Sequence, residues 1–261
     1  MFDLLEFIAE IDRIPNSIYV VHETNEYKLP THSHCKGQLI YIDGGAAYIQ
    51  MVDKTLIIPS RHYVWIPKNS PHRVEMSKSV IIRTIYFYDV DKDPFFQKDG
   101  IYPMNPLLMQ MLTYTEKWSG HILPGDDGYF FLMGIKEILP KISKKSLPIS
   151  VPVTDNQRIA PVLKYVNDHI YDNLTLKILS HDTGFSERTL SRLFQRTMKI
   201  SFLQYFKLLK MTKAIEMMIE TDISLSEIAY SLGYGSISAF SNTFYQIVKI
   251  RPSEFAKQLT N

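Results

Sequence analysis

Residues 210–255 read KMTKAIEMMIETDISLSEIAYSLGYGSISAFSNTFYQIVKIRPSEF, and the pattern of this stretch decides how the chain is organised. Its first part predicts a long helix. A short helix follows, because apolar residues recur from Leu225 at the i, i+3, i+4 and i+7 spacing of a buried helical face. Ser224 and Glu227 form a predicted capping box at its start, and Gly233 supplies the positive φ of a tight turn. Two short helices joined at a glycine turn have the layout of a helix-turn-helix.

The helix after this turn carries polar residues on the side that faces away from its apolar residues. Ser236 is placed to cap it, and Phe240 and Phe244 belong to its apolar face. Short polar side chains on an exposed helix can reach base edges in the major groove of DNA. The segment therefore predicts a DNA-reading surface, made by Ser238, Asn242 and Gln246 at i, i+4 and i+8.

A second stretch, upstream, repeats this arrangement. Gly184 supplies a turn, and Ser186 is placed to cap a helix over residues 187–198. Arginine commonly reads guanine with two hydrogen bonds, and glutamine reads adenine. A merely solvated helix face is the alternative interpretation of this polar stripe. It consists of Arg188, Ser191, Arg192 and Gln195.

The two stretches lie about fifty residues apart and are joined by a helix that begins after Ser201 and ends near Ile219. A single helix-turn-helix pattern is weak evidence, because any helical hairpin can mimic it. Two copies joined by a capped helix are much stronger evidence. Residues 155–261 therefore predict an all-α DNA-binding domain with two helix-turn-helix units joined by a long helix.

The N-terminal part has a different pattern. Short β-branched and aromatic runs alternate with turn residues, which is typical of a small barrel or sandwich. We expect strands at 17–21, 38–42, 46–51, 55–58, 63–66 and 80–88, with a hairpin turn at Asp43-Gly44-Gly45 and helices between 105 and 142. The fold class is then α+β with two domains: an effector and dimerisation domain at 1–142, a linker at 143–154, and the DNA-binding domain at 155–261.

Three histidines stand out in the predicted β domain. His32 and His34 are two residues apart, so on a strand they point to the same face. His72 begins a neighbouring strand after a tight turn, so the three imidazoles can converge. This convergence has three interpretations. The histidines hold a divalent metal, they contact an organic effector in the same cavity, or they simply line a barrel as polar groups.

The spacing of these histidines resembles the two motifs of the cupin superfamily. His32, His34, Gln38 and Gly45 fall on the first motif, and Pro67, Asn69 and His72 fall on the second. The resemblance implies a cupin-like β-barrel whose candidate metal or effector ligands are His32, His34, Gln38 and His72. Gln38 replaces the usual carboxylate, which leaves a neutral ligand set that holds a divalent ion less strongly. Asn69 replaces a glycine, and asparagine tolerates the left-handed conformation of such a turn.

Residues from about 157 to 256 resemble the DNA-binding domain of the AraC/XylS family of transcription regulators. The residues that carry the resemblance are Ala214, Ile228-Ala229, Gly233-Tyr234, Phe240, Phe244 and Pro252, with residues 190–194 in the first copy. The resemblance implies that Arg188, Ser191, Arg192 and Gln195 read one major groove and that Gly235, Ser236, Ser238, Asn242 and Gln246 face the next.

The chain departs from this family at four positions. Lys199 and Lys249 stand where glycine usually follows each recognition helix, and Arg251 replaces a capping Ser or Thr. Asn242 stands where many relatives carry arginine. We expect the three basic residues to strengthen contact with DNA phosphates.

Composition sets further limits. The net charge of the 261 residues is +2, but residues 155–261 hold thirteen Lys and Arg against ten Asp and Glu. The excess favours this half as the partner of an acidic polymer. Cys35 is the single cysteine, which excludes an internal disulfide, and no apolar run is long enough to span a membrane. We expect a soluble, cytoplasmic protein.

The sequence thus predicts a transcriptional regulator that binds promoter DNA and responds to a small-molecule or metal effector. The family resemblance implies a homodimer and contact with RNA polymerase. We expect no enzymatic activity. The alternative is a cupin metalloenzyme with an appended helical domain, since a facial set of histidines with an open position supports such chemistry.

Overall fold

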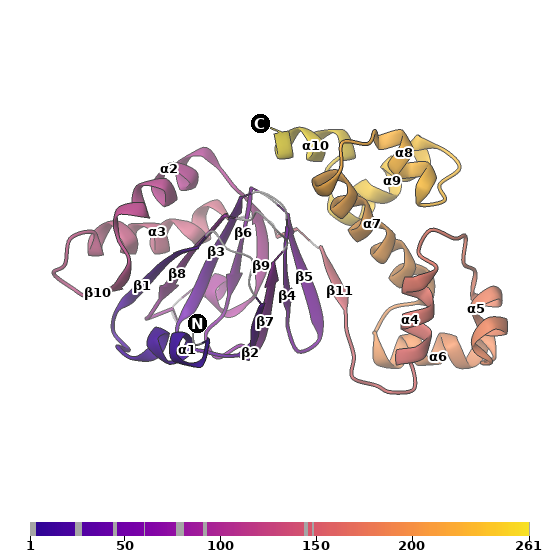
Figure 1. The fold of residues 1–261 in the computed structure, drawn as a ribbon, viewed down its shortest axis with the longest axis horizontal. Coiled ribbons are helices and arrows are strands. Elements are labelled where there is room, and N and C mark those ends of the chain that lie inside the picture. The colour runs from indigo at the N-terminus through magenta and orange to yellow at the C-terminus, as the bar shows by residue number, and fades with distance from the viewer. Residues whose placement is uncertain are drawn as a thin grey trace. The chain divides into compact units, whose positions relative to one another are not determined.

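The computed structural model describes residues 4–23, 28–43, 46–59, 61–76, 81–90, 93–143, 146–147 and 149–260. The chain forms two compact units, which comprise Met1–Met51 with Ile57–Leu147, and Val52–Leu56 with Pro148–Asn261. Antiparallel sheets dominate the first unit and helices dominate the second, which confirms the α+β class with two parts (Figure 1). Within the described residues, no helix is long and apolar enough to cross a membrane.

A six-stranded antiparallel sheet forms the centre of the first unit. Its strand order is β10 (Gly120–Ile122), β1 (Ile18–Glu23), β8 (Ile81–Phe87), β3 (Gly37–Asp43), β6 (His62–Ile66) and β9 (Gly100–Pro103). All five residues of β6, and all residues of β3 except its last, are buried. Strands buried on both faces read as continuous apolar runs, and both strands do.

A five-stranded antiparallel sheet has the order β11 (Ser150–Pro152), β5 (Lys54–Pro59), β4 (Ala46–Gln50), β7 (His72–Met76) and β2 (Lys28–His32). The described strands thus form two separate sheets and show no closed barrel, where the sequence predicted one. The strand expected around His32 is β2, but it ends at His32, so His34 lies beyond it. Pro30 lies within this strand. Proline lacks an N–H to donate, and the pairing of β2 with β7 shifts register between Leu29 and His32.

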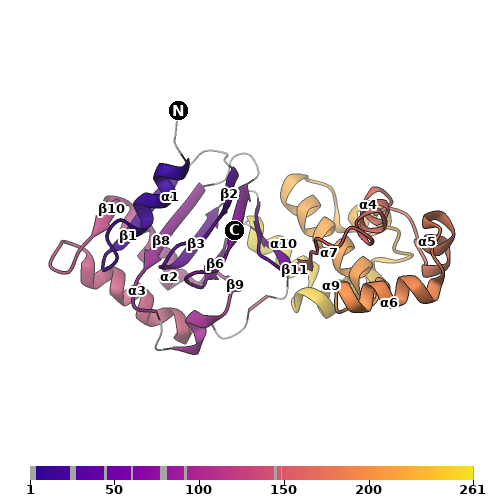
Figure 2. The same ribbon diagram turned by 90° about the horizontal axis from the view of Figure 1, so that it is seen from below.

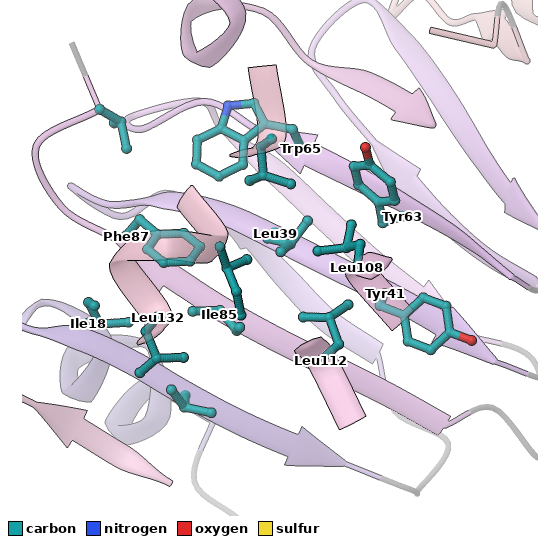
Figure 3. Close-up of a cluster of buried hydrophobic side chains, with 14 of the residues drawn as sticks. Ile18, Leu39, Tyr41, Tyr63, Trp65, Ile85, Phe87, Leu108, Leu112 and Leu132 are labelled. Carbon is teal, nitrogen blue, oxygen red and sulfur yellow. The ribbon is translucent and has the colours of Figure 1, made fainter. Parts of the chain in front are cut away.

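Two helices cover one face of the six-stranded sheet. They are α2 (Pro106–Tyr114) and α3 (Tyr129–Ile142), both close to their predicted positions. Leu108, Leu112 and Leu132 of these helices pack against Leu39 and Ile85 of the sheet (Figure 3). Helix α1 (Leu4–Asp12) contributes Ile11 to a separate small cluster with Tyr19 and Tyr86, and Figure 2 shows α1 beside the strands. The segments η1 (Pro94–Gln97) and η2 (Thr115–Lys117) are short 3₁₀ turns.

The second unit contains seven helices in its described residues. They are α4 (Ala160–Asp168), α5 (Leu176–Thr183), α6 (Glu187–Thr197), α7 (Phe202–Glu220), α8 (Leu225–Ser231), α9 (Ile237–Val248) and α10 (Pro252–Thr260). The predicted caps are confirmed: Ser186 caps α6, Ser236 caps α9, and full capping boxes begin α7 and α8. Gly184 and Gly233 have the expected positive φ, at 72° and 76°.

The expectation for the segment before α4 was incomplete. Helix α4 begins at Ala160, with Pro161 in its first turn. The side chain of Gln157 donates to the carbonyl of Asp155. In the segment predicted as a linker, β11 forms and pairs with β5.

Candidate nucleic-acid interface and metal centre

Helix α6 presents a polar face that is separated from its buried face. Ser186 accepts a hydrogen bond from the Thr189 N–H and starts the helix, and Leu190 and Phe194 are fully buried beneath it. The four predicted reading residues, Arg188, Ser191, Arg192 and Gln195, are all exposed. The polar and buried faces are separate because apolar residues recur every three or four positions and polar residues occupy the positions between them.

Part of this face borders a groove of about 650 Å³. Ser191, Arg192 and Gln195 line one side of the groove, and residues 201–203 at the start of α7 line another. Ser201 begins α7, and its side chain accepts from the Gln204 N–H. Positions 192 and 201 of the first helix pair therefore lie on the same groove.

Helix α9 presents the corresponding face of the second pair. Phe240, Phe244 and Val248 are fully buried, whereas Ser238, Asn242 and Gln246 are exposed. Gly235 is also exposed. Ser236 is only partly exposed, and its hydroxyl oxygen accepts from the Ala239 N–H. The cap thus uses Ser236, and the three exposed side chains make no cap contact.

Helix α7 runs between the two helix pairs (Figure 1). Its 19 residues span about 28 Å at 1.5 Å per residue. A helix is stiff over this length, so α7 sets the separation of α6 and α9.

Lys210 of α7 is a buried charge that the sequence analysis did not single out. Its side chain donates to the carbonyl of Asp172, in the loop after α4, at 2.9 Å, and to the carbonyl of Leu232, at the end of α8, at 2.7 Å. The ammonium also lies 4.5 Å from the ring centre of Phe206. Lys210 therefore ties segments of both helix pairs to the connecting helix. The sequence signal that could have identified Lys210 is its position among the apolar residues of a predicted helix.

Lys199 and Lys249 end α6 and α9 in the left-handed region, with φ of 60° and 69°. The Lys199 ammonium donates to the Arg196 carbonyl at 2.9 Å, and that of Lys249 donates to the Gln246 carbonyl at 2.6 Å. Cations near the C-terminus of a helix are favourable, which offsets part of the cost of a non-glycine residue there.

The three predicted histidines come together in the first unit. His32 pairs with His72 across β2 and β7, and their ring centres are 4.4 Å apart. The ring of His34 lies 5.2 Å from that of His72. One nitrogen of each residue lies within 4.8 Å of the others, and all three side chains are buried. The convergence that the spacing predicts is confirmed.

The backbone fixes the orientation of each ring. The Nδ1 atoms of His32, His34 and His72 lie 2.8, 2.6 and 2.8 Å from the carbonyl oxygens of Pro30, Lys36 and Ser70. A carbonyl only accepts, so each Nδ1 carries the hydrogen and each Nε2 keeps its lone pair. Histidines that ligate metals are commonly held in this way.

Two of these lone pairs have no hydrogen-bond partner. The Nε2 atoms of His32 and His72 are buried and unpaired in the described part of the chain. The Nε2 of His34 lies 3.2 Å from the Oε1 of Gln38, and the Gln38 amide nitrogen donates to the Tyr86 hydroxyl. In this orientation of the amide, two acceptors face each other. A bound cation would satisfy both, and so would the flipped amide.

Burial also lowers the pKa of each imidazole, because it disfavours the charged form. The pKa of His72 falls to about 3, and those of His32 and His34 fall below the usual value. The three rings are therefore neutral at neutral pH and ready to act as ligands. No carboxylate belongs to this cluster among the described residues. Asn69 adopts the predicted left-handed turn, with φ of 57°, whereas Gly45 lies outside the described residues.

Comparison with known proteins gives a consistent result. The profile of a family described as helix-turn-helix domain matches residues 179–258. YfiF, an uncharacterized HTH-type transcriptional regulator of Bacillus subtilis (strain 168), is 22% identical over 97% of this chain and 87% of that protein. The HTH-type transcriptional regulator NimR of Escherichia coli (strain K12) is 22% identical over 91% of this chain and 85% of that protein. A crystal structure of ToxT from Vibrio cholerae covers 94% of this chain and 98% of that one, with 15% identity and a TM-score of 0.40.

The two capped helix pairs with exposed polar faces, and the matched profile, define a DNA-binding transcriptional regulator. The matched profile and the regulator relatives agree with the resemblance of residues 157–256 to the AraC/XylS family.

Proposed function

We propose that the chain is a sequence-specific regulator that binds promoter DNA through both helix pairs and responds to a divalent metal ion in its first unit. The observation that supports DNA reading best is the duplication. Helices α6 and α9 share an N-cap serine, a buried aromatic residue and an exposed polar stripe. Both pairs then act as helix-turn-helix units.

The exposed side chains have separate roles in this proposal. Arg188 and Arg192 are the main base readers of the first unit, because arginine bonds guanine with two donors. Ser191 and Gln195 support them. Gly235, Ser236, Ser238, Asn242 and Gln246 face the next major groove, with Ser236 also capping its helix. One chain would then contact two grooves about one turn, or 34–36 Å, apart.

The histidine cluster supports the effector part. Three oriented imidazoles, of which His32 and His72 have an unpaired Nε2 in the described part of the chain, form a donor set that suits Zn²⁺, Cu²⁺, Fe²⁺ or Ni²⁺. Residues of both sheets contribute, since Gln38 lies on β3 and His72 on β7. The first unit would then be a cupin-like sensor built from two facing sheets. An ion regulates only if it favours one arrangement of the protein over another.

We infer that the protein is a regulator and not an enzyme. The similar proteins YfiF and NimR are described as transcriptional regulators. Among the residues that the structure describes, only histidines belong to the cluster. The proposal includes a cytoplasmic location with the promoter DNA, a homodimer, and contact with RNA polymerase. The exposed Leu107, Tyr114 and Phe130 of α2 and α3 offer apolar area for pairing.

Genomic mapping of bound DNA, followed by footprinting with competitor DNA, tests the DNA part. A specific regulator should prefer its site over bulk DNA by about 10³-fold or more. Equal binding to all sequences would indicate a nucleoid-type protein and would contradict the proposal.

Metal uptake tests the sensor. The purified chain is loaded with Zn²⁺ or Ni²⁺, dialysed and analysed for metal, and about one ion per chain is expected for a three-histidine site. The double variant His32→Ala/His72→Ala should retain none. His181→Ala removes an exposed histidine of the second unit and is the matched control. Unchanged stoichiometry in the double variant would reject the site.

A further inference from the structure

The two helix pairs can be superposed in sequence with an offset of fifty residues. Ser186 and Ser236 cap α6 and α9, and Lys199 and Lys249 end them with left-handed φ. Position 192 in the first pair is thus equivalent to 242 in the second, and 201 to 251. The residue types at these positions differ. The first pair has Arg192 and Ser201, whereas the second has Asn242 and Arg251.

The arginine of the second pair lies at the end of the pair and its side chain returns to α9. The Arg251 guanidinium donates to Oδ1 of Asn242 at 3.0 Å and to the hydroxyl of Ser241 at 3.3 Å. It also lies 4.7 Å from the ring centre of Tyr245. Three contacts with one helix face hold this long side chain in place. In α6 the positive charge at this position belongs to a residue of the helix itself, Arg192. In α9 the corresponding charge comes from Arg251, which lies outside the helix.

This contact determines how the Asn242 amide is oriented. A guanidinium has only donors, so the atom that faces it must be the amide oxygen. The oxygen and nitrogen of an asparagine amide are often interchangeable in assignment, but a donor-only partner removes that freedom. One of the two lone pairs of the Asn242 oxygen is engaged, so the two N–H donors outnumber the acceptor site left for other contacts.

The orientation matters because asparagine reads adenine with both ends of its amide. The oxygen accepts from adenine N6, and the nitrogen donates to N7. An amide oxygen that already accepts from a guanidinium keeps only one lone pair and is hindered on that side, so the two N–H donors dominate what the amide offers. Guanine N7 and O6 and thymine O4 are acceptors in the major groove, so they suit such an amide.

We propose that Arg251 is a positioning residue that sets the base preference of Asn242, turning it from an adenine reader into a reader of acceptor edges. The inference rests on the proposed role of α9 as a recognition helix. Arg251 itself need not touch a base. Its effect passes through the Asn242 amide, so both residues control the same base position.

Selection of binding sites from a randomised DNA library tests this inference with the full chain and four variants. Asn242→Ala identifies the position, since that position alone should become indifferent. The wild type should prefer guanine or thymine there. Arg251→Thr frees the oxygen and should raise the adenine preference at the same position about tenfold, within the range of one two-bond contact. Arg251→Lys supplies donors only and should keep the wild-type preference.

The double variant Asn242→Ala/Arg251→Thr separates positioning from a phosphate contact. If Arg251 acts through Asn242, the double variant shows the same base preferences as Asn242→Ala alone. If Arg251 only binds a phosphate, Arg251→Thr weakens binding to all sequences alike and reduces its salt dependence, which overturns the inference. Fold retention is checked by circular dichroism, and Arg251→Lys and Asn242→Ala carry the test if Arg251→Thr unfolds.

Failure of this inference differs from failure of the proposed function. If Arg192→Ala relaxes its own base position while Arg251→Thr leaves all base preferences intact, only the inference fails. If the wild-type chain selects no sequence at all, the proposed sequence-specific function fails as well.

Discussion

At the scale of single residues, the chemistry of the exposed α6 side chains can distinguish contacts with bases from electrostatic attraction to phosphates. Arg192 projects from the helix face beside Ser191 and Gln195, at the edge of the groove formed with the start of α7. A guanidinium can bond guanine with two parallel donors, whereas an ammonium acts as a point charge. The chemistry at residue 192 therefore distinguishes sequence reading from attraction to phosphates.

Arg192→Ala should weaken binding to the selected operator by about 1–3 kcal/mol and relax one base position, because it removes a two-bond contact. Arg192→Lys is the matched control. It keeps the positive charge, so it should bind random DNA about as well as the wild type does but should lose the base preference. Titration of operator and random DNA measures both quantities. Equal losses on the two DNAs in Arg192→Ala would assign the residue to a phosphate.

In the proposed metal site, Gln38 stands where the cupin motif has a carboxylate, and we expect this to weaken ion binding. Its Oε1 already lies 3.2 Å from the Nε2 of His34. Gln38→Glu should tighten Zn²⁺ or Ni²⁺ binding by about tenfold or more, because a carboxylate adds negative charge to a neutral ligand set. Competition with a chelator of known affinity measures the change. Weaker or unchanged binding in Gln38→Glu would place the ion away from residue 38.

The sequence supplied candidate residues for both proposed sites but not their contacts. The spacing of His32, His34 and His72 predicted their convergence, because strand geometry repeats every two residues. The carbonyl partners of the three rings depend on loop conformation, which no pattern encodes. The same is true of the bond between Arg251 and Asn242. The sequence showed Arg251 as an unusual residue near DNA, and only the structure placed it against α9.

At the scale of elements, the two turns of the second unit use glycine for different reasons. Gly184 and Gly233 both have positive φ, but a side chain at Gly184 would meet open space. A Cβ at Gly233 would lie 2.7 Å from Oδ1 of Asn173 and 3.3 Å from the Lys210 ammonium. The second turn is therefore constrained by its neighbours as well as by its backbone.

Gly184→Ala should cost about 1 kcal/mol of stability, the penalty of left-handed backbone with a side chain. Gly233→Ala should cost more, since it adds the contact with Asn173. Urea unfolding followed by helical circular dichroism reports on the second unit. Tryptophan fluorescence reports on the first, because Trp65 and Trp118 both lie there. Equal losses in the two variants would show that Asn173 moves aside without cost.

The elements with strong local signals were predicted well. Capping serines and glycine turns act within a few residues, so the starts of α6, α7, α8 and α9 were visible in the sequence. The strand at His32 was expected from the histidine spacing, but the sequence did not show that it begins at Lys28 and ends before His34. Strand β11 was read as part of a linker because its pairing with β5 joins residues about a hundred positions apart, and such pairing leaves little local trace.

At the scale of the whole molecule, the proposed reading of two grooves requires a fixed separation of α6 and α9. Lys210 contributes to it by bonding the carbonyls of Asp172 and Leu232 from the connecting helix. A buried donor that satisfies two carbonyls is hard to replace, because each carbonyl left unpaired costs about 1–3 kcal/mol. Its loss should affect both stability and spacing.

Lys210→Met should lower stability by about 2 kcal/mol or more and weaken binding to a two-groove operator more than binding to a one-groove half-site. Lys210→Arg keeps the donors and should behave closer to the wild type. Binding to both DNAs, measured at a temperature where circular dichroism shows all variants folded, gives the comparison. Proportional losses on the two DNAs would limit Lys210 to a purely structural role.

The most direct measurement of the central proposal is selection of binding sites from random DNA by the full chain. Two recognition helices joined by a stiff α7 predict an enriched site with two conserved blocks about one helical turn apart, bound about 10³-fold more tightly than bulk DNA. Arg192→Ala should blur one block and Asn242→Ala the other. Enrichment of a single block, or of no sequence at all, would contradict the proposal that both helix pairs read DNA.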